Sequence, residues 1–143
     1  RAVLAGSGSL TPDVAEAARA AGVADRLDLP GYVSDDEVVA LLDDALAVLY
    51  APYDEDYGYV TLQAFLAGKP VITTADAGGV LEWVVDGETG IVTDGSPGQL
   101  GAAVDRLAGD PELAARMGRA GRDRAAALGW PEVVARLLGA AVP

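Results

Sequence analysis

The chain has 143 residues, the usual size of one domain, and its 22 acidic and 10 basic side chains give a net charge of −12. This charge argues against a nucleic-acid-binding surface, because such a surface must neutralise phosphates with Lys and Arg. Cys and His are both absent, which excludes disulfides, zinc sites, thiol nucleophiles and Ser-His-Asp triads within the chain.

The apolar composition bears on the core and on the cellular location. There are 28 Ala residues but one Phe and one Met, so we expect a core of Val, Leu and Ala. No apolar stretch is long enough to span a membrane, and no basic region followed by an apolar one opens the chain. The sequence therefore predicts a cytoplasmic protein. Because Arg1 leads straight into an apolar run, we also expect the chain to be part of a longer protein.

Short apolar runs alternate with helical patterns through the first two thirds of the chain. This alternation predicts a parallel sheet whose strands are joined by crossover helices. The predicted strands cover residues 2–5, 26–29, 46–50, 71–74 and 90–92.

Helix start signals stand between these strands and after the last of them. They are Thr11 before Pro12, a capping box from Ser34 to Glu37, Ser96 before Pro97 and Asp110 before Pro111.

From Ser96 onward we expect no strand, but helices over residues 97–108, 111–127 and 131–139 that cover the sheet. We divide the chain into a sheet-containing domain, residues 1–127, and a closing helix within residues 128–143. The arginines of the middle helix should form a solvated face: Arg116, Arg119, Arg122 and Arg124.

Ligands of an open parallel sheet bind beyond the carboxyl ends of the strands, so the loops that follow strands are the candidate binding loops. They are residues 6–8, 31–34, 53–58 and 76–79, and each contains glycine.

The third of these loops is the most informative, because it places Gly58 directly before a helix that should end near Gly68. A helix N-terminus offers unpaired backbone N–H groups and a positive dipole end, which suit a phosphate, and Gly58 would let an anion approach the backbone. Leu62, Phe65 and Leu66 should pack on the sheet and leave Gln63 pointing elsewhere. An ordinary turn followed by a surface Gln is the alternative interpretation.

The segment from Glu55 through Gly79, which contains EDYGYVTLQAFLAGKP, resembles the signature of the retaining group 1, or family 4, glycosyltransferases of the GT-B fold. The flanking AVLAGSG and GWPEVVARLL resemble other parts of the C-terminal donor-binding domain of that family. The resemblance implies an α/β fold, in which a Rossmann-like doubly wound parallel sheet carries a helical C-terminal cover. It also implies that the donor half lacks its first βα unit here.

The resemblance implies roles for single residues. Glu55 would hold hydroxyls of the donor hexose beside the reacting carbon, and Gln63 would hold the ribose diol. The family has a second Glu at the position of Gln63, and a carboxamide, with one acceptor end, should bind the diol less strongly. The implied donor-binding residues are Gly6, Gly8, Val33, Asp56, Tyr57, Gly58, Tyr59, Val60 and Gln63.

Three charged positions have competing interpretations. Asp54-Glu55-Asp56 matches the Asp-x-Asp that holds a divalent ion in glycosyltransferases of another fold, but the predicted phosphate-binding helix would make a metal redundant, so we expect no metal and no other cofactor. Lys69 should cap the C-terminus of the helix that precedes it. Glu82 should either brace the loop at Gly78 and Gly79 or be solvated.

The family also supplies parts that the chain lacks. An Arg and a Lys for the diphosphate come from an upstream strand and helix, and an N-terminal domain binds the acceptor. In the strand order 3-2-1-4-5-6 the missing strand is the central one, so we expect a gap between the strands at 2–5 and 46–50, filled by a longer protein or a second chain.

The predicted function is therefore donor binding in the transfer of a hexose from a nucleotide diphosphate sugar to an acceptor hydroxyl. The acceptor, a glycan or a small molecule, would bind through the N-terminal domain, and any membrane contact would also use parts outside this chain. We expect the chain alone to be inactive. The alternative, favoured by Gln63, is a non-catalytic sugar-nucleotide-binding or scaffolding homologue.

Overall fold

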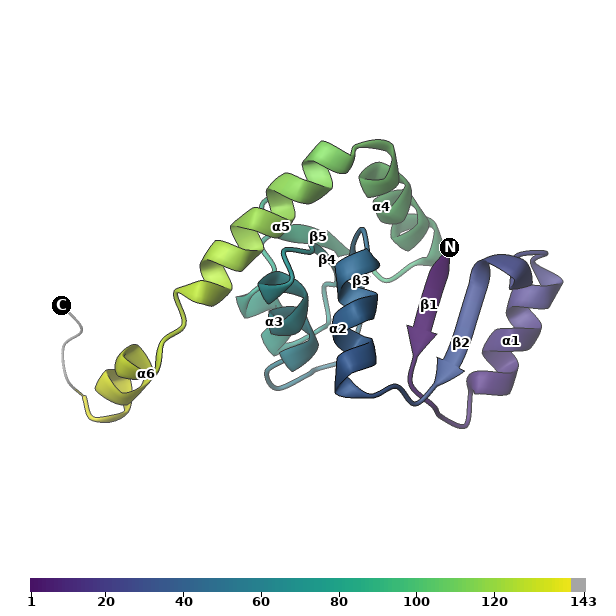
Figure 1. Ribbon diagram of the computed structural model, residues 1–143. Helices are drawn as coiled ribbons and strands as arrows, with labels where there is room; N and C mark the ends of the chain where they lie inside the picture. Colours follow the sequence, from purple (N-terminus) through teal and green to yellow (C-terminus); the bar gives the residue numbers. More distant parts are fainter. Residues whose placement is uncertain (140–143) are drawn as a thin grey trace. The chain divides into compact units, whose positions relative to one another are not determined.

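Two separate parallel sheets carry the fold in the computed structural model, which describes residues 1–139 (Figure 1). They lie in two structural units, Arg1–Leu41 and Leu42–Pro143. Residues 140–143 of the predicted closing segment lie outside the described residues. Among the residues described, no helix is both long and apolar enough to cross a membrane.

The first unit holds β1 (Ala2–Ala5), α1 (Thr11–Ala20), a short 3-10 helix η1 (Ala24–Arg26), β2 (Leu27–Gly31) and the start of α2 (Asp35–Asp44). β1 and β2 pair in parallel, with Ala2 opposite Leu27. The prediction that the second strand starts at Arg26 was wrong by one residue, because Arg26 closes the 3-10 turn. Arg1 donates to Asp28 over 2.6 Å at the amino end of this sheet.

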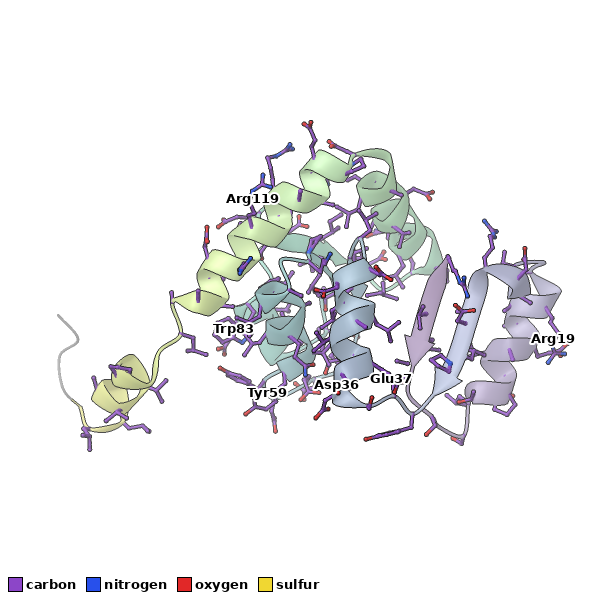
Figure 2. The ribbon with its side chains drawn as sticks, in the orientation of Figure 1. Arg19, Asp36, Glu37, Tyr59, Trp83 and Arg119 are labelled. Carbon is purple, nitrogen blue, oxygen red and sulfur yellow. The ribbon has the colours of Figure 1, made fainter. Side chains whose placement is uncertain are left out.

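The predicted capping box opens α2. The backbone N–H of Ser34 donates to Oε2 of Glu37 over 2.7 Å, and the N–H of Glu37 donates to the hydroxyl of Ser34 over 3.4 Å. The backbone and then the hydroxyl of Ser34 hold the pKa of Glu37 below its ordinary value, because both donate to its ionised form. Glu37 and its neighbour Asp36 lie in the first turn, where negative charge suits the helix dipole (Figure 2).

The second unit is doubly wound around β4. Its sheet has the order β3-β4-β5, all parallel, with β3 at Val48–Leu49, β4 at Val71–Thr74 and β5 at Gly90–Thr93. All residues of β4 are buried. Its first two residues, Val71 and Ile72, belong to different core clusters. α3 (Tyr59–Leu66) contributes to the first cluster and α4 (Pro97–Gly109) to the second, so both faces of the sheet are covered.

The strand pairings within each unit agree with the predicted strand order. The pairs β1-β2 and β3-β4-β5 are those that the order 3-2-1-4-5-6 leaves when strand 1 is removed. The predicted strand 46–50 shortens to two residues, as it lies at an edge where Leu46 and Leu49 are 43% and 55% exposed. β1 is exposed along its whole length.

Two helices follow α4, namely α5 (Pro111–Ala126) and α6 (Trp130–Leu137). The caps of α4 and α5 were predicted correctly, since Ser96 accepts from the N–H of Gln99 and Asp110 from that of Leu113. At α1, by contrast, Leu10 precedes Thr11 as the N-cap, and no side chain caps the helix. α5 joins both core clusters of the second unit through Met117 and Ala125. Its four arginines are exposed, as expected, and Figure 2 shows Arg119 pointing away from the sheet.

The core of the described residues is built mainly of Ala and Val, as expected, but Leu contributes less than predicted. The single Phe and the single Met are both fully buried, together with Ile72 and Leu107, while most leucines are partly exposed. Phe65 and Leu62 pack as predicted, but Leu66 is 58% exposed. Phe65 fills the space against the sheet, so Leu66 is left exposed at the helix end.

Candidate functional site

The loops that follow β3 and β4 run side by side at the carboxyl edge of the second sheet. The N–H of Asp54 donates to the carbonyl of Asp76 over 2.9 Å, and the N–H of Gly79 donates to the carbonyl of Glu55 over 2.6 Å. Glu55 and Gly78 form an isolated parallel bridge. The backbone of Glu55 is therefore held from both sides by residues more than twenty positions away.

Two glycines make this close approach possible. A Cβ on Gly78 would lie 2.6 Å from the carbonyl oxygen of Glu55, and one on Gly79 would lie 2.1 Å from that of Asp56. Gly78 also has φ +66°, a conformation that side chains with a Cβ rarely adopt. The paired glycines are thus part of the wall that supports Glu55.

The carboxylate of Glu55 is half-buried and has two protein donors. The Tyr50 hydroxyl donates to Oε2 over 3.0 Å, and the N–H of Asp56 donates to Oε1 over 3.1 Å. Burial, followed by the hydrogen bond and the charge of Glu55, raises the pKa of Tyr50, so the phenol stays protonated and can keep donating.

α3 begins where the sequence predicts, with Gly58 as its N-cap in the left-handed conformation at φ 74°. A Cβ on Gly58 would lie 2.6 Å from the Val80 side chain. The group that approaches Gly58 closely in this structure is therefore Val80, from the segment that follows β4. Within residues 1–139 the N–H groups of Tyr59 and Val60 donate to no backbone carbonyl. They form an open helix N-terminus next to Glu55 in the sequence.

Most of the other predicted donor-binding residues near this helix start are open to solvent. Tyr59 is 73% exposed, Val60 is 36% exposed, and Asp56 and Gln63 are also exposed. Tyr57 is half-buried, and its ring packs against Tyr59 and edge-on against Trp83, at centroid distances of 5.1 and 5.6 Å. Figure 2 labels Tyr59 and Trp83.

Two basic side chains of the second unit, Lys69 and Arg124, donate to backbone carbonyls. The Lys69 ammonium donates to the carbonyl of Asp43 over 2.9 Å, so Lys69 caps α2 rather than the helix that precedes it, contrary to the prediction. The two ends meet only because the strand after Lys69 pairs with the strand after α2. Arg124 donates to the carbonyl of Glu82 over 2.7 Å, and Glu82 itself is exposed, which agrees with its solvated interpretation.

The remaining predicted residues lie in the first unit. Gly6 follows β1 with φ 120°, and its N–H donates to the carbonyl of Gly31 over 2.7 Å, so the carboxyl ends of β1 and β2 are joined. The N–H of Gly8 donates to the Thr11 hydroxyl over 3.2 Å. Both glycines have open space where a Cβ would be, which is compatible with residues that line a binding cleft.

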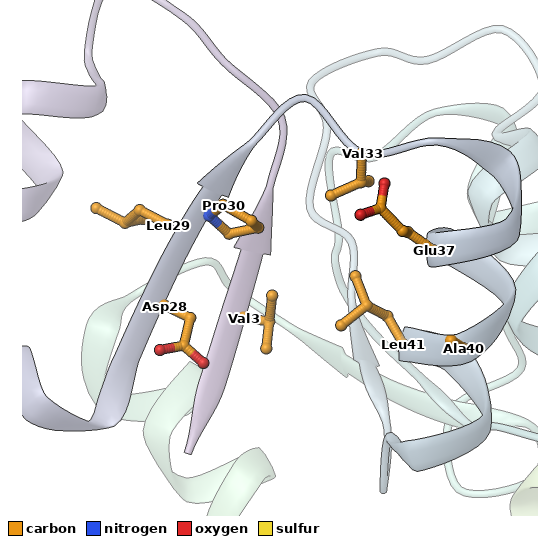
Figure 3. Close-up of a pocket in the computed structure, with 8 residues that line it drawn as sticks. All are labelled: Val3, Asp28, Leu29, Pro30, Val33, Glu37, Ala40 and Leu41. Atoms are coloured by element: carbon orange, nitrogen blue, oxygen red, sulfur yellow. The ribbon is translucent and has the colours of Figure 1, made fainter.

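Val33 lines a cavity of about 510 Å³ between the first sheet and α2. Val3 on β1 and Leu41 on α2 lie on opposite sides of it, and the Glu37 carboxylate lies near its upper end (Figure 3). In residues 1–139, no three His, Cys, Asp or Glu side chains gather closely enough to hold a metal ion.

Sequence reasoning missed Tyr50 and the contact of the paired glycines with Glu55. Tyr50 and Glu55 are five residues apart in a segment without a regular period, so their spacing does not predict a contact. The paired glycines were visible as a motif, but their partner lies in a different loop.

A family model described as glycosyl transferases group 1 matches residues 1–124. A D-inositol 3-phosphate glycosyltransferase of Streptomyces avermitilis is 33% identical over 127 residues, which cover 87% of this chain and 27% of that protein. The chain thus spans about a quarter of the length of this curated relative.

Two solved structures share the fold. Sucrose-phosphate synthase from Thermosynechococcus elongatus superposes with a TM-score of 0.81 at 26% identity, over 96% of this chain and 36% of that one. Anabaena HepE, solved in complex with UDP-glucose, superposes with a TM-score of 0.81 at 21% identity, over 96% of this chain and 39% of that one.

Proposed function

The chain belongs to the group 1 glycosyl transferases, and we propose that it is the donor-binding part of a retaining enzyme that moves a hexose from a nucleotide diphosphate sugar to an acceptor hydroxyl. The observation that carries the proposal is a carboxylate, Glu55, fixed a few residues before an open helix N-terminus. That HepE was solved with UDP-glucose supports a nucleotide sugar as the donor.

In this proposal each part of the site has a chemical task. The Glu55 carboxylate accepts hydrogen bonds from hydroxyls of the hexose, and the N-terminus of α3 stabilises the negative charge that develops on the departing diphosphate. The backbone from Tyr57 to Val60 contacts sugar and phosphate, Gln63 contacts the ribose, and Val33, Gly6 and Gly8 line the nucleotide end. No divalent ion takes part.

The rest of the enzyme lies outside this chain in the proposal. Lys69 and Arg124 donate to backbone carbonyls, so we expect the cations for the diphosphate, like the acceptor-binding domain for a glycan or small molecule, to be supplied by other parts of the protein. The chain alone then does not transfer sugar. We place the protein in the cytoplasm, with any peripheral membrane contact made by those other parts.

Replacing Glu55 by Gln tests the proposal. In the protein as its host produces it, turnover of nucleotide sugar should fall at least about tenfold, or about 1.4 kcal/mol in activation free energy, because a carboxamide offers one acceptor oxygen to the sugar instead of two. The melting temperature should change little, since the Glu55 carboxylate is only half-buried. Steady-state kinetics with UDP-glucose and GDP-mannose, together with a thermal melt, measure both effects.

Glu88→Gln is the matched control, because Glu88 is exposed in another loop and should leave turnover unchanged. If Glu55→Gln is as active as the unaltered protein, Glu55 is a solvated loop residue and its role in the proposal is wrong.

Gln63 distinguishes a ribose-contacting residue from a surface Gln. Gln63→Glu replaces neutral hydrogen bonds to the diol with charge-assisted ones, but it also adds repulsion toward Glu55 and the diphosphate, so we expect about 1 kcal/mol of tighter binding, roughly fivefold in Kd. Gln63→Ala should weaken binding by a similar factor. Calorimetry with nucleoside diphosphate gives the three dissociation constants.

A deoxyribose nucleotide serves as the control for Gln63, because it lacks one hydroxyl of the diol and should bind the Gln and Glu proteins alike. Equal affinity of all three proteins for the ribonucleotide would mean that position 63 does not contact the ligand.

A non-catalytic sugar-nucleotide-binding or scaffolding homologue is the second candidate, because Gln63 stands where the family has an acid. The two candidates differ in one measurement: such a homologue binds nucleotide sugar but transfers no hexose to any acceptor, and Gln63→Glu does not restore transfer.

A further inference from the structure

We propose that Tyr50 is a positioning residue that sets the orientation of the Glu55 carboxylate for the donor sugar. The inference rests on the proposed function and adds to it a residue outside the signature segment. Its basis is the contact between the Tyr50 hydroxyl and Oε2 of Glu55.

The backbone of Glu55 is already fixed, so its side-chain torsions are the freedom that remains. Its N–H donates to the carbonyl of Ala77, and its carbonyl accepts from Gly79. Without hydrogen bonds to its oxygens, the Glu55 carboxylate would be free to rotate toward solvent. The hydrogen bond from Tyr50, 3.0 Å long and part-buried, ties one oxygen, and the N–H of Asp56 ties the other.

This arrangement leaves acceptor capacity for a ligand. A carboxylate has about four lone-pair sites, and the protein uses one on each oxygen, so each oxygen can still accept from a sugar hydroxyl. Two neighbouring hydroxyls would then meet a carboxylate whose plane is preset, and the donor would not have to order it on binding.

Tyr50 is held through both its backbone and its ring. Its N–H donates to the carbonyl of Ile72 over 2.9 Å, which continues the pairing of β3 with the buried strand β4. Its Cε1 atom lies 3.5 Å from where a Cβ on Gly58 would be, so the ring borders the start of α3. Tyr50 thus couples the sheet, the carboxylate and the helix N-terminus.

The neighbouring Tyr53 supplies a matched control. It lies in the same loop, but it is 83% exposed, and its hydroxyl makes no hydrogen bond within residues 1–139. Tyr50→Phe removes the proposed hydrogen bond and keeps the ring, while Tyr53→Phe removes a hydroxyl that has no partner in the part of the chain described.

The test is a double-mutant cycle in the protein as its host produces it, with Tyr50→Phe, Glu55→Gln, the double variant and Tyr53→Phe. For each protein we would measure kcat and KM for UDP-glucose or GDP-mannose, whichever is turned over, the Kd of the matching nucleoside diphosphate, and the melting temperature. The nucleoside diphosphate lacks the hexose that Glu55 would contact, so its affinity should not depend on the orientation of Glu55.

We expect Tyr50→Phe to lower kcat about tenfold while the Kd of the nucleoside diphosphate stays within about twofold, as loss of one charge-assisted hydrogen bond would do. In the Glu55→Gln background the same change should alter kcat less than about twofold, because there is no carboxylate left to orient. Tyr53→Phe should match the unaltered protein.

The positioning role is overturned if Tyr50→Phe has unaltered kcat, if it lowers kcat by the same factor in the Glu55→Gln background as in the unaltered protein, or if it lowers only the melting temperature. A failure of the proposed function is distinct, because then the unaltered protein itself does not turn over nucleotide sugars, whether or not it binds them.

Discussion

Gly79→Ala is expected to lower sugar transfer at least about a hundredfold, because the new methyl group would separate the two loops that hold Glu55. Its Cβ would lie 2.1 Å from the carbonyl oxygen of Asp56 and 3.1 Å from that of Glu55. These atoms are backbone and cannot rotate away, so the loops must move by about 1 Å, a displacement that can cost a hundredfold in rate.

The same displacement breaks a structural contact. The N–H of Gly79 donates to the carbonyl of Glu55 over 2.6 Å, and separation of the loops removes this bond. We expect a loss of about 1–3 kcal/mol in unfolding free energy, as in other overpacked sites. Nucleotide-sugar kinetics and a urea titration of the same sample would measure the two losses.

Gly98→Ala provides the control for Gly79→Ala. Gly98 lies exposed in the first turn of α4, with open space where a Cβ would be, and its replacement should leave both turnover and stability nearly unchanged. Normal kinetics of Gly79→Ala would show that the loop contact does not position Glu55.

Gly118→Ala should destabilise the second unit by about 3 kcal/mol or more, at the upper end of overpacking effects. Gly118 is buried on α5, and a Cβ there would lie 1.9 Å from the carbonyl oxygen of Gly68 and 3.2 Å from the backbone nitrogen of Lys69. α5 cannot simply move outward, because Met117 is buried beside Gly118 and Gly121 lies directly against the ring of Phe65.

Chemical denaturation of Gly118→Ala beside Gly101→Ala gives the measurement and its control. Gly101 also lies inside a helix, but it is exposed and has nothing within 4 Å of an added Cβ. Ala at that position should stabilise the protein by about 0.4–1 kcal/mol, since it reduces the freedom of the unfolded chain. If Gly118→Ala gains the same stability, α5 does not pack closely on the end of α3.

Features that depend on neighbouring residues were largely readable from the sequence. β1 and β4 occupy the predicted residues, and the caps at Ser34, Ser96 and Asp110 form as expected. A cap is a contact over three positions and a strand is a short run of one residue class, so both leave a local pattern. The signature around Glu55 likewise indicated the family that the comparison with residues 1–124 shows.

Features that depend on distant residues were decided by the tertiary structure. Lys69 reaches Asp43 rather than its own helix, the single Phe and Met, Phe65 and Met117, are fully buried in a core mainly of Ala and Val, and Gly78 and Gly79 hold the backbone of Glu55. Each depends on which atoms lie within a few ångströms once the strands pair, and spacing along the chain contains no measure of that distance. The sequence by itself therefore determined the class of protein and the candidate carboxylate, whereas only the packing of the two loops decided how that carboxylate is held.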